Sequence, residues 1–142
     1  MDVARFLNAV VNDRGYRDQL VHVQEIPARE ARYADLQPPL PALLEARLHE
    51  MGIQRLYSHQ AEAIAAVRAG RNVVVTTGTA SGKSLCYHLP VLERYLRDPE
   101  SRALYLFPTK ALAQDQLRGL LRLGEGILPP EWVGTYDGDT PS

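Results

Sequence analysis

The residues best suited to chemistry are a glycine, a lysine and a hydroxyl residue in direct succession, Gly82, Lys83 and Ser84. Glycine has no Cβ, so the backbone around it can approach an anionic oxygen closely, and a lysine here can reach the β and γ phosphates of a nucleotide. The hydroxyl of Ser84 can bind Mg²⁺. These residue types in this order predict a site for the phosphate groups of a nucleotide.

The segments on either side of this triplet are of the kind that builds a phosphate site. Three consecutive valines, Val73 to Val75, predict a short strand that is buried on both faces of a parallel sheet. Small residues follow from Thr76 to Gly82, and a helix is expected to begin near Lys83 and Ser84. In this order, the unpaired N–H groups of the loop and the positive end of the helix dipole favour an anion at one place.

The spacing departs from the usual phosphate-loop motif at one position. That motif has a glycine five residues before Gly82, whereas this chain has Thr77 there and Gly78 one position later. A bare Gly-Lys-Ser occurs by chance in many proteins, and clusters of small residues are usually only turns. The strand expected before the loop and the amphipathic helix expected after it favour the nucleotide site.

Length, charge and cysteine content limit the remaining possibilities. The 142 residues are 45% hydrophobic, which is enough for one domain with a real core. A net charge of −1 argues against a protein held on nucleic acid mainly by bulk electrostatics, though not against one that grips phosphates through N–H groups. The one cysteine, Cys86, rules out an internal disulfide and fits a reducing compartment, the cytoplasm; a buried thiol is favoured over a nucleophile because no partner base is evident. The sequence has no stretch that is apolar and long enough to span a membrane.

Apolar spacing and end signals predict several helices. They are expected at Val3 to Asp13, packed on another element, at Pro41 to Glu50, from an N-cap at Ser58 to Gly70, from the phosphate loop to Arg97 and at Ala111 to Leu123. The prolines of Leu20 to Leu40 indicate an extended connector. We therefore expect an N-terminal helix and connector at residues 1–40 and a domain at residues 41–142.

A second continuous apolar run, Ala103 to Phe107, suits a strand parallel to the first and joined to it by a helical crossover. Ligands of parallel sheets lie beyond the carboxyl ends of the strands, so Thr109 and Lys110 are expected on the functional edge. Whether they hold a ligand or cap a helix is left open by their types. Trp132 to Tyr136 predicts a third, weaker strand. Together these elements predict an α/β fold with a parallel sheet flanked by helices.

Gln60 lies near the start of the helix that precedes the phosphate loop. A glutamine there is by default a solvated helix former. Its amide also offers one donor and one acceptor, the pair that matches the N6 and N7 edge of adenine. Its position upstream of a phosphate loop favours this second interpretation.

Four segments, in order, resemble motifs of the superfamily 2 DEAD/DEAH-box helicases. They are Tyr57 to Gln60 (YSHQ), Thr77 to Ser84 (TGTASGKS), Phe107 to Leu112 (FPTKAL) and Thr135 to Pro141 (TYDGDTP). They are similar to the Q motif, motif I, motif Ia and the region around motif Ib. The sequence looks closest to the MrfA (YprA)-like branch, which is related to RecQ-like helicases, and the resemblance runs from Pro27 to Ser142. It implies a RecA-like P-loop NTPase fold, in which a small residue other than glycine is common at the position of Thr77.

The resemblance implies an ATP site with Mg²⁺ as its metal. Gln60 would read adenine, with Tyr57 against the base. Lys83 would be the catalytic cation on the β and γ phosphates, and Ser84 would bind Mg²⁺. The residues implied to hold the triphosphate are Thr79, Ala80, Ser81, Gly82, Lys83 and Ser84.

The resemblance also implies a nucleic-acid partner, with DNA favoured over RNA. Pro108, Thr109 and Lys110 would contact the sugar-phosphate backbone of one strand, and the loop at Gly138 would do the same. Asp137 and Asp139 should repel phosphate, so a contact there is assigned to backbone N–H groups.

Other parts that this superfamily needs are not found in the sequence. The metal-binding DExH or DEAD carboxylates have no counterpart, since no Asp-Glu pair occurs, and the arginine fingers belong to a second RecA-like domain. Asp137 is a poor substitute, because Gly134 and Thr135 weaken the strand before it and no Glu follows. We therefore expect the N-terminal part of a larger helicase, with essentially no ATPase by itself. A non-motor P-loop enzyme such as a kinase, and a module that binds ATP or nucleic acid without turnover, remain alternatives.

Overall fold

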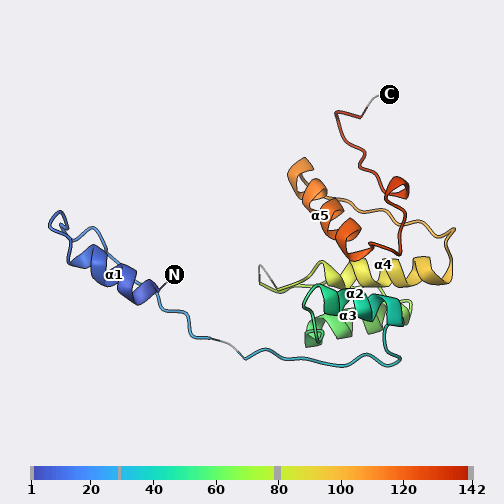
Figure 1. Ribbon diagram of the computed structural model, residues 1–142, viewed down its shortest axis with the longest axis horizontal. Coiled ribbons are helices and arrows are strands. Elements are labelled where there is room, and N and C mark those ends of the chain that lie inside the picture. Colours follow the sequence, from blue (N-terminus) through green and yellow to red (C-terminus); the bar gives the residue numbers. More distant parts are fainter. Residues whose placement is uncertain (1, 29, 79–80, 141–142) are drawn as a thin grey trace. The chain divides into compact units, whose positions relative to one another are not determined.

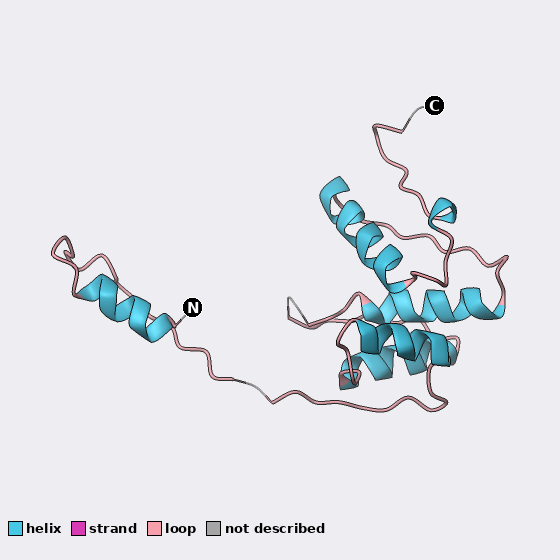
Figure 2. Ribbon diagram, in the orientation of Figure 1, coloured by secondary structure: helices cyan, strands magenta, loops and turns pink. Residues whose placement is uncertain are grey.

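The computed structural model describes residues 2–28, 30–78 and 81–140. The chain divides into two compact units, residues 1–30 and residues 31–142. Across the described residues the regular elements are helical (Figures 1 and 2). They are α1 (Val3–Val11), α2 (Ala42–Glu50), α3 (Ser58–Arg68), α4 (Leu85–Arg97), α5 (Lys110–Leu123) and the short 3-10 helix η1 (Pro130–Trp132). None of the described helices is long and apolar enough to cross a membrane.

The ends of the helices follow from local sequence, as expected. At the start of α5, the Thr109 hydroxyl oxygen accepts a hydrogen bond from the N–H of Leu112 at 3.3 Å. Gly52 and Gly70 follow α2 and α3 with φ values of 81° and 71°, a left-handed conformation that glycine adopts without strain. These residues therefore end their helices where the sequence indicated.

The unit of residues 1–30 contains α1, an amphipathic helix with no buried residue. No residue of α1 is buried, and Val3 and Phe6 are 60% and 54% exposed. Within this unit the apolar face of α1 stays exposed, and packing of this helix on another element remains a prediction.

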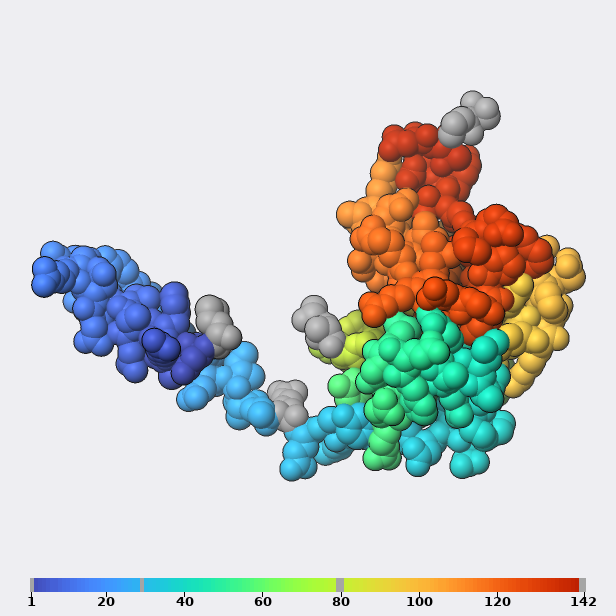
Figure 3. All heavy atoms as spheres, viewed as in Figure 1, coloured from blue at the N-terminus to red at the C-terminus, as the bar shows by residue number. Residues whose placement is uncertain are grey.

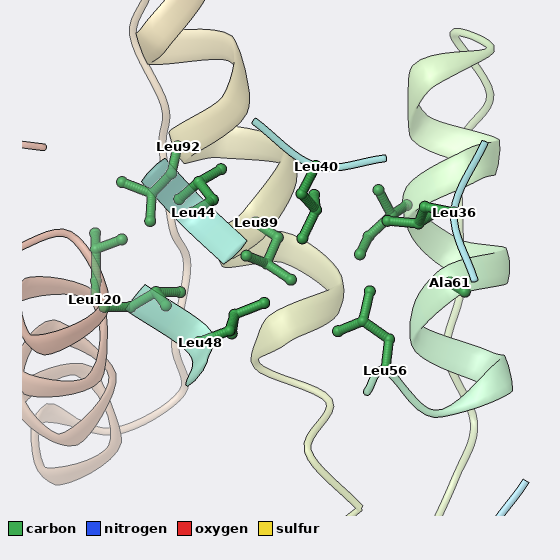
Figure 4. Close-up of a cluster of buried hydrophobic side chains, with 11 residues drawn as sticks. Leu36, Leu40, Leu44, Leu48, Leu56, Ala61, Leu89, Leu92 and Leu120 are labelled. Carbon is green, nitrogen blue, oxygen red and sulfur yellow. The ribbon is translucent and has the colours of Figure 1, made fainter. Parts of the chain in front are cut away.

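The unit of residues 31–142 has a core of apolar side chains, mostly leucines, from four helices and the segment before them. Leu44 and Leu48 of α2 meet Leu89 and Leu92 of α4, with Leu120 of α5 beside them (Figure 4). Helix α3 packs along α4, and α2 also contacts α5. In the space-filling view, the green atoms of α2 lie against the orange and red atoms of α5 and the residues after it (Figure 3). The leucine spacing of these helices therefore builds one apolar core.

Residues 31–40, which we expected to belong to a connector, are part of this core. Leu36 and Leu40 are 8% and 6% exposed. The guanidinium of Arg68, near the end of α3, donates to the carbonyl oxygens of Pro38 and Pro39. The same guanidinium forms an ion pair with Glu93 of α4 at 2.9 Å, so one side chain ties the segment, α3 and α4 together.

The expected parallel sheet does not form among the described residues, which contain an isolated bridge between Tyr33 and Tyr57 but no strand. Val74 is 88% exposed, so the prediction that the valine run is buried on two sides is wrong. In the second run, Leu104 and Leu106 are 85% and 82% exposed, whereas Tyr105 between them is half-buried. A strand needs a paired neighbour for its N–H and C=O groups, and neither run has one here.

The third expected strand is also absent. Trp132 ends the 3-10 helix η1, and the residues from Val133 to Tyr136 form no ladder. Pro130 at the first position of η1 supplies the fixed φ that favours a helical turn over a strand.

Candidate nucleotide-binding site

Lys83 lies inside the loop that precedes α4, and its ammonium is bound by the loop itself. Its Nζ donates to the carbonyl oxygens of Thr77 at 2.9 Å and Gly78 at 2.5 Å, and lies 3.4 Å from the Ser81 hydroxyl. The hydroxyls of Thr77 and Ser81 are 2.6 Å apart. The loop therefore wraps around a cation at the N-terminal end of a helix, the place where an anion is also favoured.

Ser84 and Gly82 complete the described part of this loop. Gly82 has a φ of 73°, which places it in the left-handed region. Ser84 is the N-cap of α4, and its Oγ accepts a hydrogen bond from the Tyr87 hydroxyl at 3.3 Å. Thr79 and Ala80, two of the predicted phosphate-binding residues, lie outside the described residues.

Gln60 is buried, and both ends of its amide are bonded within the protein. It is 2% exposed; its Oε1 accepts from the N–H of Tyr57 at 2.8 Å, and its Nε2 donates to the carbonyl oxygen of Gly82 at 2.9 Å. Tyr57, and not Ser58 as predicted, is the N-cap of α3, and the first bond satisfies its backbone N–H. Gln60 is therefore no solvated helix former, because it joins the start of α3 directly to the phosphate loop.

Tyr57 is 38% exposed, and its ring is stacked with two other rings. The ring centroid of Tyr33 lies 5.3 Å away and that of His59 lies 5.8 Å away, with interplanar angles of 14° and 11°. His59 also bonds the loop, since its Nε2 lies 3.0 Å from the carbonyl oxygen of Ser81. No role was assigned to His59 or Tyr33 from the sequence. The signal that could have indicated His59 was its position directly before Gln60.

Three titratable groups, Cys86, His88 and Tyr105, have pKa values shifted by burial toward their neutral forms. Burial raises the pKa of the Cys86 thiol, which is 5% exposed, so the prediction of a buried thiol is confirmed. Burial lowers the pKa of His88 to about 4, and it raises the pKa of Tyr105. His88 Nδ1 lies 3.3 Å from the Tyr105 hydroxyl, whereas its Nε2 has no partner among the described residues. With His88 neutral, the positive charge at this end of α4 is that of Lys83.

The residues predicted to contact nucleic acid come together at the start of α5. The Lys110 ammonium pairs with Asp139 and lies 3.8 Å from Asp137, beside Gly138 of the same turn. Thr109 caps α5 as described, and Pro108 directly precedes it and is exposed. The N–H groups of Asp137 and Asp139 are bonded within the turn, to Thr140 and Asp137 respectively. Two acidic residues thus neutralise the one lysine of this cluster.

The structure therefore gathers the predicted site residues into two groups. Tyr57, Gln60, Ser81, Gly82, Lys83 and Ser84 surround the loop before α4, whereas Pro108, Thr109, Lys110 and Gly138 surround the start of α5. No cluster of three or more His, Cys, Asp or Glu side chains suited to a metal ion lies within the described ranges.

Comparison with known proteins gives a family and several relatives. The family model described as DEAD/DEAH box helicase matches residues 57–142. The chain is 42% identical to the uncharacterized ATP-dependent helicase YprA of Bacillus subtilis over 134 residues, which cover 94% of this chain and 18% of that protein. It is 46% identical to the ATP-dependent helicase HRQ1 of Saccharomyces cerevisiae over 128 residues, 88% of this chain and 12% of that protein. The chain thus spans less than a fifth of the length of these relatives.

Two solved structures share its fold. The crystal structure of the DUF1998 helicase MrfA bound to DNA matches with a TM-score of 0.79 and 38% identity, over 99% of this chain and 20% of that one. The crystal structure of MrfA bound to DNA and AMPPNP matches with a TM-score of 0.75 and 39% identity, over 97% of this chain and 19% of that one. The fold is therefore that of part of a helicase, although the described residues here contain no paired strands.

Proposed function

This chain belongs to the DEAD/DEAH box helicase family, and we propose that it is the ATP-binding part of an ATP-dependent DNA helicase of the MrfA and YprA type. The observation that carries the proposal is the position of Lys83 inside a loop at the start of α4. Because the same loop is bonded to Gln60, one site brings together a cation for phosphates and an amide suited to adenine.

The residues present fit ATP. The Lys83 ammonium now satisfies two backbone carbonyls, and a phosphate group binds in exchange for those contacts. Gly82 has a φ of 73°, a conformation that glycine adopts without strain and that suits a loop whose N–H groups surround an anionic oxygen. Lys83 holds the β and γ phosphates and Ser84 holds the Mg²⁺ that accompanies them. Bound Mg²⁺ supplies charge neutralisation of the phosphates.

We assign Gln60 to the adenine base. In this structure its amide is bonded to Tyr57 and Gly82, and these bonds use one of its two N–H groups and one of the two lone pairs of its oxygen, so the others can serve adenine. Tyr57 lies at the same end of α3, and in this assignment it lies beside the base. Because the Gln60 amide also bonds Gly82, it links the base site to the phosphate loop.

We also assign the start of α5 to binding of the DNA backbone. The residues assigned to this contact are Pro108, Thr109, Lys110 and the turn at Gly138. The assignment of DNA over RNA is supported by the DNA-bound MrfA structures and by DNA helicases among the relatives, including Hel308 of Thermoplasma acidophilum at 39% identity over 88 residues. Pairing of Lys110 with Asp139 lowers the positive charge here, so contacts with DNA compete with this ion pair.

The test is to measure nucleotide binding and turnover by these 142 residues. We expect ATP to bind in a Lys83-dependent manner, since Lys83→Ala removes the cation of the loop. We expect no appreciable turnover, because the Asp-Glu carboxylates and the arginine fingers of the superfamily are not among these residues. In a full-length protein that contains this chain, we expect ATP hydrolysis to rise with single-stranded DNA.

Three results would contradict the proposal. The first is an ATP affinity that Lys83→Ala does not change. The second is robust hydrolysis by the 142 residues alone that depends on Lys83. The third is full-length turnover that single-stranded DNA does not stimulate, which would favour a non-motor P-loop enzyme. Lys110→Ala is the matched control for Lys83→Ala, since it removes the same charge outside the nucleotide site.

A further inference from the structure

Two adjacent side chains at the start of α3 hold two adjacent carbonyl groups of the phosphate loop. His59 binds the carbonyl oxygen of Ser81 at 3.0 Å, and Gln60 binds that of Gly82 at 2.9 Å. A carbonyl oxygen only accepts hydrogen bonds, so the Nε2 of His59 carries a proton and donates it. Residues of one helical turn thus fix two consecutive peptide groups.

Fixing these carbonyl groups also fixes the N–H groups that bind phosphate. In a planar trans peptide, the C=O and the N–H of the following residue point in opposite directions. The Ser81 carbonyl faces His59, so the N–H of Gly82 points away from α3. In the same way, the bond from Gln60 directs the N–H of Lys83 away from α3. Both N–H groups therefore point to the side of the loop that faces away from α3, where our proposed site places the phosphates.

Gly82 has a backbone that needs such a restraint. Its φ is 73°, and glycine adopts positive and negative φ values with similar ease. The peptide group between Ser81 and Gly82 can therefore rotate at low cost. The hydrogen bond from His59 is the contact that the structure shows on the Ser81 carbonyl. Loss of this bond leaves the Gly82 N–H free to turn out of the loop.

His59 is itself held by a stack of side chains that extends to Tyr33, a residue far from the phosphate loop in sequence. Its ring lies on Tyr57, Tyr57 lies on Tyr33, and the guanidinium of Arg55 lies 5.2 Å from the centre of the Tyr33 ring. The backbones are joined as well, since the Ala34 N–H donates to the Leu56 carbonyl at 3.1 Å. The stack fixes the ring plane of His59 and so aims its Nε2 at Ser81.

We propose that His59 is a positioning residue for phosphate binding, which acts through the Ser81 carbonyl and is held in place by the Tyr57 and Tyr33 rings. This inference rests on the proposed function and deepens it. In this proposal His59 contacts neither the base nor a phosphate. It holds the loop in its binding conformation, so that phosphate binding costs less conformational entropy. Tyr33 becomes part of the nucleotide site although it lies outside the helicase motifs.

The test compares two substitutions of His59 that separate the ring from the donor. His59→Phe keeps a stacking ring and removes the N–H, whereas His59→Gln keeps an N–H at a similar reach and removes the ring. Binding of ATP and of tripolyphosphate, which has no base, is measured for each variant by calorimetry. His49→Phe, at an exposed position on α2, is the matched control.

We expect His59→Phe to weaken ATP and tripolyphosphate equally, by about fivefold, the effect of one lost hydrogen bond. We expect His59→Gln to recover part of the loss and Tyr33→Leu to show a smaller loss. Melting temperatures of the variants should match that of the parent chain, because the ring of His59 is only partly buried. A loss for ATP without one for tripolyphosphate would overturn the inference in favour of a base contact, and unchanged affinities would overturn it outright.

Failure of the proposed function gives a different result. If the parent chain binds neither ATP nor tripolyphosphate, the proposed function fails, and amide hydrogen exchange then decides the inference. His59→Phe should speed exchange at residues 81–84 by several-fold relative to His49→Phe, because the Ser81 carbonyl loses its partner. Equal exchange in the two variants would overturn the positioning role.

Discussion

The side-chain nitrogen of Gln60 lies 2.9 Å from the carbonyl oxygen of Gly82, and this hydrogen bond joins the start of α3 to the phosphate loop. The two residues are 22 positions apart in the chain. A Cβ on Gly82 would lie 2.5 Å from the same nitrogen, so the contact is possible only with glycine at this position. Base recognition and phosphate binding therefore share one contact in our proposed site.

Gly82→Ala should destabilise the chain and abolish nucleotide binding. The new Cβ meets the Gln60 amide, and an alanine at a φ of 73° is strained. We expect a loss of about 2 kcal/mol in the free energy of unfolding, measured by urea titration. Gly78→Ala is the control, since a Cβ there meets nothing within 4 Å, and its effect should stay within about 0.5 kcal/mol. Equal effects of the two substitutions would contradict the close approach of Gln60.

Gln60→Glu should reduce the preference of the site for ATP over tripolyphosphate. Glutamate keeps an acceptor but places a second oxygen where adenine N7 and the Gly82 carbonyl both need a donor. We expect the ratio of the two affinities to fall by about tenfold, the size of one base contact. Calorimetry with the two ligands measures this ratio. An unchanged ratio would show that Gln60 supports the loop without reading the base.

Arg68→Met should weaken the helical core far more than the same change at Arg94. Arg68 and Glu93 are 13% and 5% exposed in their side chains, so removing the arginine leaves a buried carboxylate whose remaining partner among the described residues is the exposed Arg97. We expect a loss of about 3 kcal/mol in the free energy of unfolding. The Arg94 and Asp98 side chains are 66% and 42% exposed, and Arg94→Met should cost within about 0.5 kcal/mol. Similar losses would contradict a buried link between α3 and α4.

The stability of the chain should fall as the pH drops from 6.5 toward 4, in part because of His88. Burial lowers its pKa from 6.5 to about 4 in the folded state. Between these values the unfolded chain binds a proton that the folded chain does not, so the free energy of unfolding falls with decreasing pH, with a limiting slope of about 1.4 kcal/mol per pH unit. Below the folded pKa both states are protonated and this contribution levels off. His88→Leu should lack it, and identical pH profiles of the two proteins in urea titrations would refute the assignment.

Asp139→Asn should strengthen binding of single-stranded DNA by removing the nearer of the two carboxylates beside Lys110. Asp137, at 3.8 Å, is the weaker partner, so Lys110 can then neutralise one more phosphate. Affinity should then fall more steeply with salt, by about 0.7 in the slope of log K against log salt concentration. Asp115→Asn, which breaks the exposed pair with Arg118 elsewhere on α5, makes the same change in net charge and should leave the slope unchanged. Fluorescence anisotropy across a salt series measures both, and an equal slope for the two variants would remove Lys110 from the DNA site.

The sequence determined the helices of this protein and the residues of its phosphate loop. Leucine spacing in Leu85–Arg97 and Lys110–Leu123, and glycines at positions 52 and 70, gave limits that the structure reproduces within a few residues. A helix is held by hydrogen bonds between residues that are close in sequence, so local residue types suffice to predict it. The motif order also pointed to the helicase family, because that signal is carried by residue types and spacing alone.

The tertiary structure decided the strands and the partners of the polar side chains. The runs at Val73–Val75 and Ala103–Phe107 have strand-like composition but remain unpaired in the described structure, because a strand takes its hydrogen bonds from another segment. The roles of Gln60 and His59 likewise depend on carbonyl groups 22 residues away, which no local pattern reveals. Contacts between distant segments fixed what each of these side chains binds, and only folding brings those segments together.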